Sequence, residues 1–212
     1  MRLKKGLMIS AIAVAGVLGL SACAADTGTT DPEVTVPEFA AGTTMAELAD
    51  AGKITIGTKF DQPLFGLKGP SGDPVGFDVE IGKIIAASLG ISEGNIEWVE
   101  TVSANRETFI ENGTVDIVIA TYTINDTRKE VISFAGPYYN AGQDILVLAG
   151  NPEGITGPDD LAGKDVCSVA GSTSEKNISE YGVNLITTDT YSNCQRCSRD
   201  LVLRWFVGCG VE

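Results

Sequence analysis

Three positively charged side chains follow stretches that have the composition of buried β-strands. They are Lys59 after residues 53–58, Arg106 after residues 96–99, and Arg128 after residues 116–120. Only nine lysines and arginines occur between positions 23 and 194, so three at predicted strand ends form a notable share of them. Ammonium and guanidinium groups bind small anions through charge-assisted hydrogen bonds. The pattern therefore predicts a site for an anionic small molecule, whereas each cation taken alone is more typical of a solvated surface charge.

Hydroxyl groups accompany these cations. Thr121 and Thr123 stand between the strand predicted at 116–120 and Arg128. Further along, Ser172 and Thr173 open a predicted helix directly after a strand. Backbone N–H groups and hydroxyls at such a helix start suit an anionic group. Simple N-capping by one of the two hydroxyls explains the same pattern.

The elements that would position these residues alternate along the chain. Helices are predicted at 44–49, 77–89, 105–112 and 171–181, and strands at 53–58, 96–99, 116–120, 143–148 and 165–170. This alternation predicts an α/β fold with a largely parallel sheet. Ligands of such sheets bind at the carboxyl ends of the strands. Lys59, Arg106 and Arg128 are therefore predicted to face one crevice.

Composition narrows the functional classes. The 212 residues carry a formal net charge of -13 and include no histidine. Strong negative charge disfavours nucleic acid as a partner because phosphates would be repelled. Without histidine, the commonest general base and the commonest metal ligand are missing. We therefore predict neither a cofactor nor a metal site.

The N-terminus predicts export and lipid anchoring. Three cations precede an apolar stretch that ends in small residues before Cys23, so residues 1–22 are interpreted as a lipoprotein signal peptide and Cys23 as the lipidation site. A secretory signal that happens to contain a cysteine is the alternative. Residues 23–43 have the composition of a flexible tether. The predicted location is the outer face of the cell membrane, at the cell surface or in the periplasm.

An ordered set of motifs carries a family resemblance. The motifs are Gly76-Phe77-Asp78, Asn105-Arg106, Asn112-Gly113-Thr114-Val115-Asp116, Thr123-x4-Arg128, Phe134-x2-Pro137-Tyr138-Tyr139 and Gly171-Ser172-Thr173. Over roughly residues 45 to 194 the chain resembles the polar amino-acid solute-binding proteins of ABC importers, family 3, and in particular their glutamate/aspartate branch. Each motif is weak alone, but their order behind a lipoprotein signal is specific.

The resemblance implies a type II periplasmic-binding-protein fold, in which two α/β lobes joined by a hinge close on an amino acid. On this basis residues 44–142 are predicted to form the first lobe, 143–149 a hinge strand, and 150–194 a partial second lobe. Residues 195–212 do not follow the family pattern and are interpreted as an atypical tail. Our hypothesis is that the reading frame was lost near residue 194, which would leave the second lobe incomplete and transport weak or absent; the other reading frames of the DNA would test it.

The resemblance also implies roles for individual residues. Arg128 is expected to hold the ligand α-carboxylate as a bidentate fork, with the Thr123 hydroxyl and the backbone near Thr121 adding hydrogen bonds. Ser172 and Thr173 are expected to reach the ligand from the second lobe. Arg106, assisted by Lys59, is expected to hold the side-chain carboxylate of the ligand. The implied partners are an amino acid, an ABC permease and the membrane, with the protein itself a monomer.

Cysteine pairing and two other functions stay open. Cys167 and Cys194 are predicted to form a disulfide outside the cytoplasm, although connectivity cannot be read from sequence. An enzyme on the same scaffold, such as a periplasmic prephenate-type dehydratase, is the main alternative function. It requires a positioned general acid, and no carboxylate stands out beside the cations. A sensor-type ligand domain would require a transmembrane segment and a signalling module.

Overall fold

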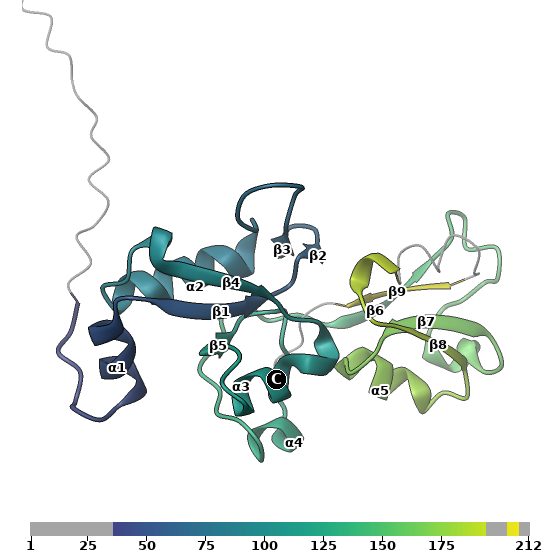
Figure 1. Cartoon of the computed structure of the whole chain (residues 1–212). Helices are drawn as coiled ribbons and strands as arrows, with labels where there is room; N and C mark the ends of the chain where they lie inside the picture. The colour runs from purple at the N-terminus through teal and green to yellow at the C-terminus, as the bar shows by residue number, and fades with distance from the viewer. Residues whose placement is uncertain (1–35, 194–202, 208–212) are drawn as a thin grey trace, which may run out of the picture. The chain divides into compact units, whose positions relative to one another are not determined.

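β-Branched and apolar residues form two larger sheets, and a two-stranded hairpin accompanies the first, as Figure 1 shows. The computed structural model describes residues 36–193 and the backbone of residues 203–207. The residues interpreted as a signal peptide, Cys23, most of the segment interpreted as a tether, and Cys194 lie outside the described residues, so those predictions are not tested by the structure. Both sheets belong to the same compact unit of the chain. None of the helices in the described ranges has the length and apolar character that a bilayer crossing requires.

The first sheet is parallel, as predicted. Its strands are β1 (Ile54–Thr58), β4 (Ile96–Glu100) and β5 (Ile117–Val118), in the order β4-β1-β5. In the register of this sheet, Ile56 of β1 is paired with Trp98 of β4 on one side and with Ile117 of β5 on the other. Ile54 and Ile56 of the central strand β1 lie on the same face of the sheet and are buried in one core with Ala86. The carboxyl ends of all three strands therefore lie at one edge of the sheet.

The strand β5 is shorter than predicted, and the reason is local. The prediction covered residues 116–120, but β5 ends at Val118, and the backbone of Thr121, three residues further on, turns with a φ of 45°. A small hairpin that the sequence did not predict, β2 (Asp61–Gln62) with β3 (Gly66–Leu67), follows β1. Two-residue strands carry too little alternation for a pattern to reveal them.

Four helices belong to this first half of the chain. They are α1 (Thr44–Ala51), α2 (Phe77–Ser88), α3 (Arg106–Glu111) and α4 (Asp126–Lys129), with 3₁₀ turns at Glu93–Asn95 and Ser103–Asn105. Helix α1 begins at an N-cap, Thr43, whose side chain accepts from the N–H of Ala46, and α4 begins at an equivalent N-cap, Asn125. Helix α2 packs on β1 and contributes Ala86 to the core around Ile54 and Ile56.

The second sheet contains β6 (Gln143–Val147), β7 (Asp165–Val169), β8 (Asn184–Thr188) and β9 (Leu203–Val207), in the order β6-β9-β7-β8. Strand β7 is parallel to both neighbours, and β6 is antiparallel to β9. A 3₁₀ turn at Pro158–Leu161 and helix α5 (Thr173–Ser179) complete this half. Its core contains Leu161, Val166 and Ile178, all fully buried.

The segment interpreted as an atypical tail contributes a strand. The backbone of β9 lies between β6 and β7, where it pairs in register with both. The second sheet therefore extends beyond residue 194, past the boundary predicted for the partial second lobe. The hypothesis of a lost reading frame is a statement about the DNA and stays a prediction.

Candidate functional site

Arg106 begins helix α3 and is held by backbone carbonyl groups. Its Nε donates to the carbonyl oxygen of Ser103 at 3.1 Å, and its Nη1 donates to those of Ala120 at 3.3 Å and Thr121 at 3.4 Å. Its Nη2 donates to the carbonyl oxygen of Gly171 at 3.2 Å. The side chain is 2% exposed. These bonds fix the plane of the guanidinium beyond the carboxyl end of β5.

Arg128 reaches the same acceptor from helix α4. Its Nη2 donates to the carbonyl oxygen of Gly171 at 3.2 Å, and its Nη1 donates to the carbonyl oxygen of Thr123 at 2.8 Å and to Oγ1 of Thr173 at 3.1 Å. The structure thus brings Arg106 and Arg128 together at a single oxygen atom. This is the convergence that the strand-end argument predicts, while the ligand-binding roles of the two residues remain predictions.

The ring of Tyr122 supports both arginines, a feature the sequence analysis missed. The guanidinium carbons of Arg106 and Arg128 lie 4.2 Å and 4.6 Å from its centroid, within cation–π range. The Tyr122 hydroxyl is buried and lies near the Glu107 carboxylate. Burial, followed by the nearby Glu107 carboxylate, raises the pKa of Tyr122. The residue thus stays a neutral platform for two cations.

Glu107 is the acidic partner in this cluster. Its Oε1 accepts from Nε of Arg128 at 3.1 Å. Burial acts to raise the pKa of Glu107, but the Tyr122 hydroxyl, the residue's own backbone N–H and the charges of Arg128 and Arg106 outweigh it and lower the pKa below its ordinary value. Glu107 is therefore ionised at neutral pH and orients the Arg128 fork. Its position directly after Arg106 was the available signal in the sequence.

Replacing Glu107 by glutamine should destabilise the fold at neutral pH but not in acid. Because the folded-state pKa is lowered, the stability that Glu107 contributes is present above the unfolded-state value of about 4.3 and disappears as the pH falls through the folded-state value. Urea unfolding of wild type and Glu107→Gln at pH 7 and at several values below 4.5 measures this difference. The exposed Asp126–Lys129 pair supplies the control variant Asp126→Asn, for which we expect little change. A wild-type advantage that is constant across pH would contradict the assignment.

Lys59 lies at the end of β1 and is 4% exposed. Its Nζ donates to Oγ of Ser103 at 2.8 Å. Nearby, the hydroxyl of Thr121 donates to Oε1 of Gln62 at 2.8 Å. The predicted cation at this strand end therefore does line the site, together with Ser103 and Gln62, which were not predicted.

Ser172 and Thr173 lie at the start of helix α5, beside the second sheet: Ser172 is the N-cap and Thr173 is the first helical residue. Oγ of Ser172 accepts from the N–H of Glu175 at 3.0 Å, so the N-capping interpretation is correct for this residue. Thr173 instead directs its hydroxyl to Arg128. Gly171 has a φ of 74°, and a Cβ there would lie 2.6 Å from Cα of Ala104, so this close approach requires glycine.

These residues enclose a small cavity of about 20 Å³. It is lined by Lys59, Gln62, Ser103, Arg106, Thr121, Thr123, Val169, Ser172, Thr173 and Tyr191. The lining includes six of the seven residues predicted to bind the ligand, and the seventh, Arg128, contacts two of the lining residues. A volume this small holds about one water molecule. An amino acid would therefore enter only if the 171–173 segment moved away from the arginines.

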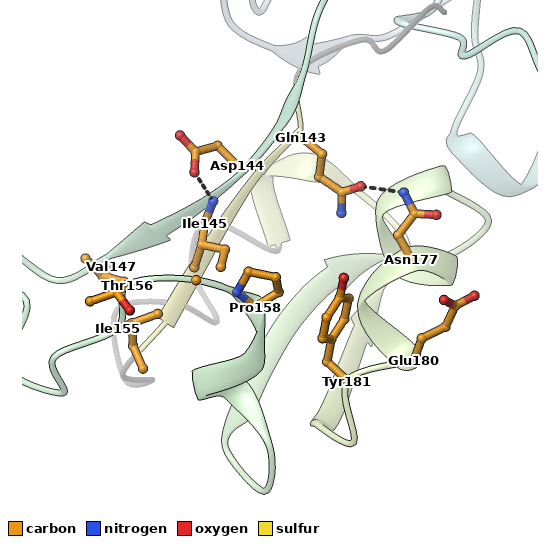
Figure 2. Close-up of a pocket in the computed structure, with 11 residues that line it drawn as sticks. Gln143, Asp144, Ile145, Val147, Ile155, Thr156, Pro158, Asn177, Glu180 and Tyr181 are labelled. Atoms are coloured by element: carbon orange, nitrogen blue, oxygen red, sulfur yellow. Dashed lines mark hydrogen bonds between the residues drawn. The ribbon is translucent and has the colours of Figure 1, made fainter.

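Larger hollows lie elsewhere and have different chemistry. One of about 500 Å³, shown in Figure 2, is bordered by β6, the 157–158 turn and α5. Gln143 and Asn177 are hydrogen-bonded across it, and its charged lining residues are Asp144 and Glu180. Another of about 380 Å³ beside β5 is mainly apolar. Neither has a lysine or arginine among its lining residues, so the arginine cluster is the candidate site for an anion.

The predicted disulfide has one partner within the described residues. Cys167 lies on β7 and is fully buried. Cys194 lies outside the described residues, so the pairing stays a prediction. Among the described residues, no group of three or more acidic or cysteine side chains gathers in a way that would hold a metal ion.

Residues 54–202 match the bacterial extracellular solute-binding proteins, family 3, and the chain therefore belongs to this family. It is 42% identical over 149 residues to the glutamate-binding protein GluB of Corynebacterium efficiens, covering 68% of this chain and 51% of that protein. It is 34% identical to a glutamine-binding protein of Geobacillus stearothermophilus, covering 88% of this chain and 73% of that protein. The chain thus spans only about half the length of the first relative.

Solved structures confirm the type II periplasmic amino-acid-binding fold. The crystal structure of the ancestral amino acid-binding protein AncCDT-1, a precursor of cyclohexadienyl dehydratase, is 28% identical with a TM-score of 0.72. The match covers 77% of this chain and 74% of that chain. Part of that chain therefore has no counterpart in this one, as expected if the second lobe is incomplete. Similarity to these proteins does not decide which amino acid this chain binds, because they bind different ligands. The ligand must be inferred from the chemistry of the site.

Proposed function

We propose that this chain captures an acidic amino acid, glutamate being the best supported, outside the cytoplasm and delivers it to an ABC permease. The observation that carries the proposal is the meeting of two guanidinium groups at the carbonyl oxygen of Gly171. A carboxylate accepts stronger hydrogen bonds from arginine than a neutral carbonyl does. A ligand carboxylate would therefore displace Gly171 from this position.

The charge balance favours an acidic ligand over a neutral one. Lys59, Arg106 and Arg128 supply three positive charges, while Glu107 and Asp78 supply at most two negative ones. The cluster therefore carries at least one net positive charge. Glutamate, with a net charge of minus one, neutralises it, whereas glutamine leaves it unchanged.

The acidity of the whole chain does not oppose this preference. At physiological salt the Debye length is about 8 Å, so distant surface carboxylates are largely screened. The site cations are buried and act at hydrogen-bond distance. Local attraction therefore outweighs the long-range repulsion that the net charge would produce.

Thermal melting of the full chain with each of the twenty amino acids tests the proposal. We expect glutamate to raise the melting temperature most, with glutamine and aspartate next, because ligand binding to the folded state stabilises it. Isothermal titration calorimetry then measures Kd for each ligand that causes a shift. Preference for a basic amino acid, or no shift with any, would contradict the proposal.

A dehydratase is the second candidate function, because AncCDT-1 is a precursor of such an enzyme. The site offers two carboxyl groups for acid catalysis. Glu107 has a lowered pKa and stays ionised. Burial raises the pKa of Asp78, but this residue is fully buried and its two oxygens already accept from Thr121 and Tyr138, so it does not face a substrate. Neither suits a general acid, so we propose binding without turnover. Incubation with prephenate-like acids, followed by chromatography for products, tests this distinction.

Anchoring through Cys23 and a monomeric state complete the proposed function. Two or more acyl chains would hold the protein at the outer face of the cell membrane, where it would capture a diffusing ligand. Mass spectrometry of the N-terminal peptide tests acylation, and an unmodified Cys23 would exclude it. Light scattering of the purified chain tests the monomeric state.

A further inference from the structure

The backbone of Thr121 adopts a conformation that a threonine rarely adopts. Its φ is 45°, in the left-handed region, where L-residues with a branched side chain are strained. Such a residue persists only where its surroundings hold it from several directions. Thr121 lies three residues beyond the end of β5, and its carbonyl oxygen accepts from Arg106, so its conformation affects how this arginine is held.

Every polar group of Thr121 has a partner. Its N–H donates to Oδ2 of Asp78 at 2.7 Å, its hydroxyl donates to Oε1 of Gln62 at 2.8 Å, and its carbonyl oxygen accepts from Nη1 of Arg106 at 3.4 Å. The bond that the Thr121 N–H donates to Asp78 joins residues 43 positions apart. It is therefore a tertiary contact between the first turn of α2 and the loop after β5.

Asp78 is an unusual residue to find at this position. Its side chain is fully buried, and besides Thr121 it accepts from the hydroxyl of Tyr138 at 3.0 Å. Burial raises its pKa, although the bonds from Thr121 and Tyr138 and the charge of Lys59 act in the opposite direction. A raised pKa means that the ionised form costs folding stability at neutral pH. The two groups that donate to this carboxylate, rather than a gain from its charge, therefore account for its presence here.

We infer that Asp78 is a positioning residue for the amino-acid site. Its carboxylate holds Thr121 in the left-handed conformation, and this directs the carbonyl oxygens of Ala120 and Thr121 toward Arg106. The guanidinium is thereby oriented before a ligand arrives. The inference rests on the proposed function and extends it to a residue that is linked to Arg106 through Thr121.

The bond to Tyr138 gives the same carboxylate a second connection. Tyr138 belongs to the segment that leads into β6, the first strand of the second sheet. Asp78 therefore contacts both the loop that holds Arg106 and the chain that links the two sheets. The two bonds can be separated experimentally, because Tyr138→Phe removes only the second.

The test compares four variants of the full chain. Asp78→Ala removes both bonds, whereas Asp78→Asn keeps an oxygen that accepts from the N–H of Thr121. The matched control is Asp116→Ala, because Asp116 makes the same kind of bond, from the N–H of Thr55 to Oδ2 at 2.7 Å, before β5 rather than after it. Calorimetry measures Kd for glutamate, and amide hydrogen exchange of the ligand-free chain measures protection at Thr121.

We expect Asp78→Ala to weaken glutamate binding by about 5- to 100-fold, since it leaves a buried N–H without an acceptor. Asp78→Asn should restore affinity to within about fivefold of wild type, because one neutral hydrogen bond replaces a charge-assisted one. Tyr138→Phe and Asp116→Ala should change affinity less than Asp78→Ala does. Exchange at Thr121 should become faster only in Asp78→Ala.

Three results would overturn the inference. They are unchanged affinity in Asp78→Ala, unchanged exchange at Thr121 in that variant, and a loss in Tyr138→Phe as large as in Asp78→Ala. If the wild-type chain binds no amino acid, the proposed function fails. The exchange measurement on ligand-free protein then still decides whether Asp78 holds the turn.

Discussion

Replacement of Arg128 by alanine is expected to abolish amino-acid binding in calorimetric titrations. The guanidinium donates to Gly171 and Thr173, so a ligand carboxylate at this place would accept from the same two nitrogens. Charge-assisted hydrogen bonds contribute roughly 1.5–3 kcal/mol each, and two of them correspond to a loss of more than about 100-fold. The variant also leaves the Glu107 carboxylate without its arginine partner.

Two further variants separate charge from geometry at this position. Arg128→Lys keeps the charge but not the fork, so we expect most of the affinity to be lost. Lys129→Ala removes the neighbouring cation, which is paired with Asp126 on the surface, and should leave binding unchanged. Circular dichroism shows whether each variant is folded. Binding by folded Arg128→Ala within about threefold of wild type would contradict its role, since a lost charge-assisted bond costs more than that.

Replacement of Arg106 by alanine is expected to lower glutamate binding more than glutamine binding. The two ligands share an α-carboxylate, and only glutamate carries a second negative charge for Arg106 and Lys59. A charge-assisted bond is worth about 1 kcal/mol more than a neutral one, so the glutamate-to-glutamine affinity ratio should fall by about fivefold or more. Calorimetric titration of both ligands into the same preparation measures the ratio.

The control for this variant must test loss of structure, because Arg106 also holds the carbonyl oxygens of Ala120 and Thr121. A general disruption of the loop would weaken the binding of glutamate and of glutamine to the same extent. Lys83→Ala, which removes a partly exposed cation on α2 that is paired with surface glutamates, should leave the ratio unchanged. Equal losses for glutamate and glutamine in Arg106→Ala would overturn the side-chain assignment.

The regular elements could be predicted because their spacing is periodic. The runs at 53–58 and 96–99 and the helix at 77–89 correspond closely to β1, β4 and α2. Strands β2, β3 and β8 could not be found in this way, since two are very short and Asn184–Thr188 is a mixed polar segment. Strand β9 was missed because its segment does not follow the family pattern, and only pairing with β6 and β7 makes it a strand.

The cations of the site could be predicted because parallel strands end at one edge of a sheet. Most of the groups that hold these cations could not, since they lie 14 to 65 positions away in the sequence. Asp78 contacts Thr121 from 43 residues away, although it stands within the quoted Gly76-Phe77-Asp78 motif. The stacking of both guanidiniums on Tyr122 depends on a turn at Thr121 that no local pattern indicates. Tertiary contacts, rather than propensity, complete this site.

The central claim is that two arginines from separate helices hold the carboxylates of one amino acid. A crystal structure of the full chain with L-glutamate tests it most directly. The account predicts the ligand α-carboxylate within hydrogen-bond distance of the Arg128 guanidinium, the side-chain carboxylate beside Arg106, and the Gly171 carbonyl displaced from both. A ligand bound elsewhere, with Arg106 and Arg128 still donating to Gly171, would contradict it.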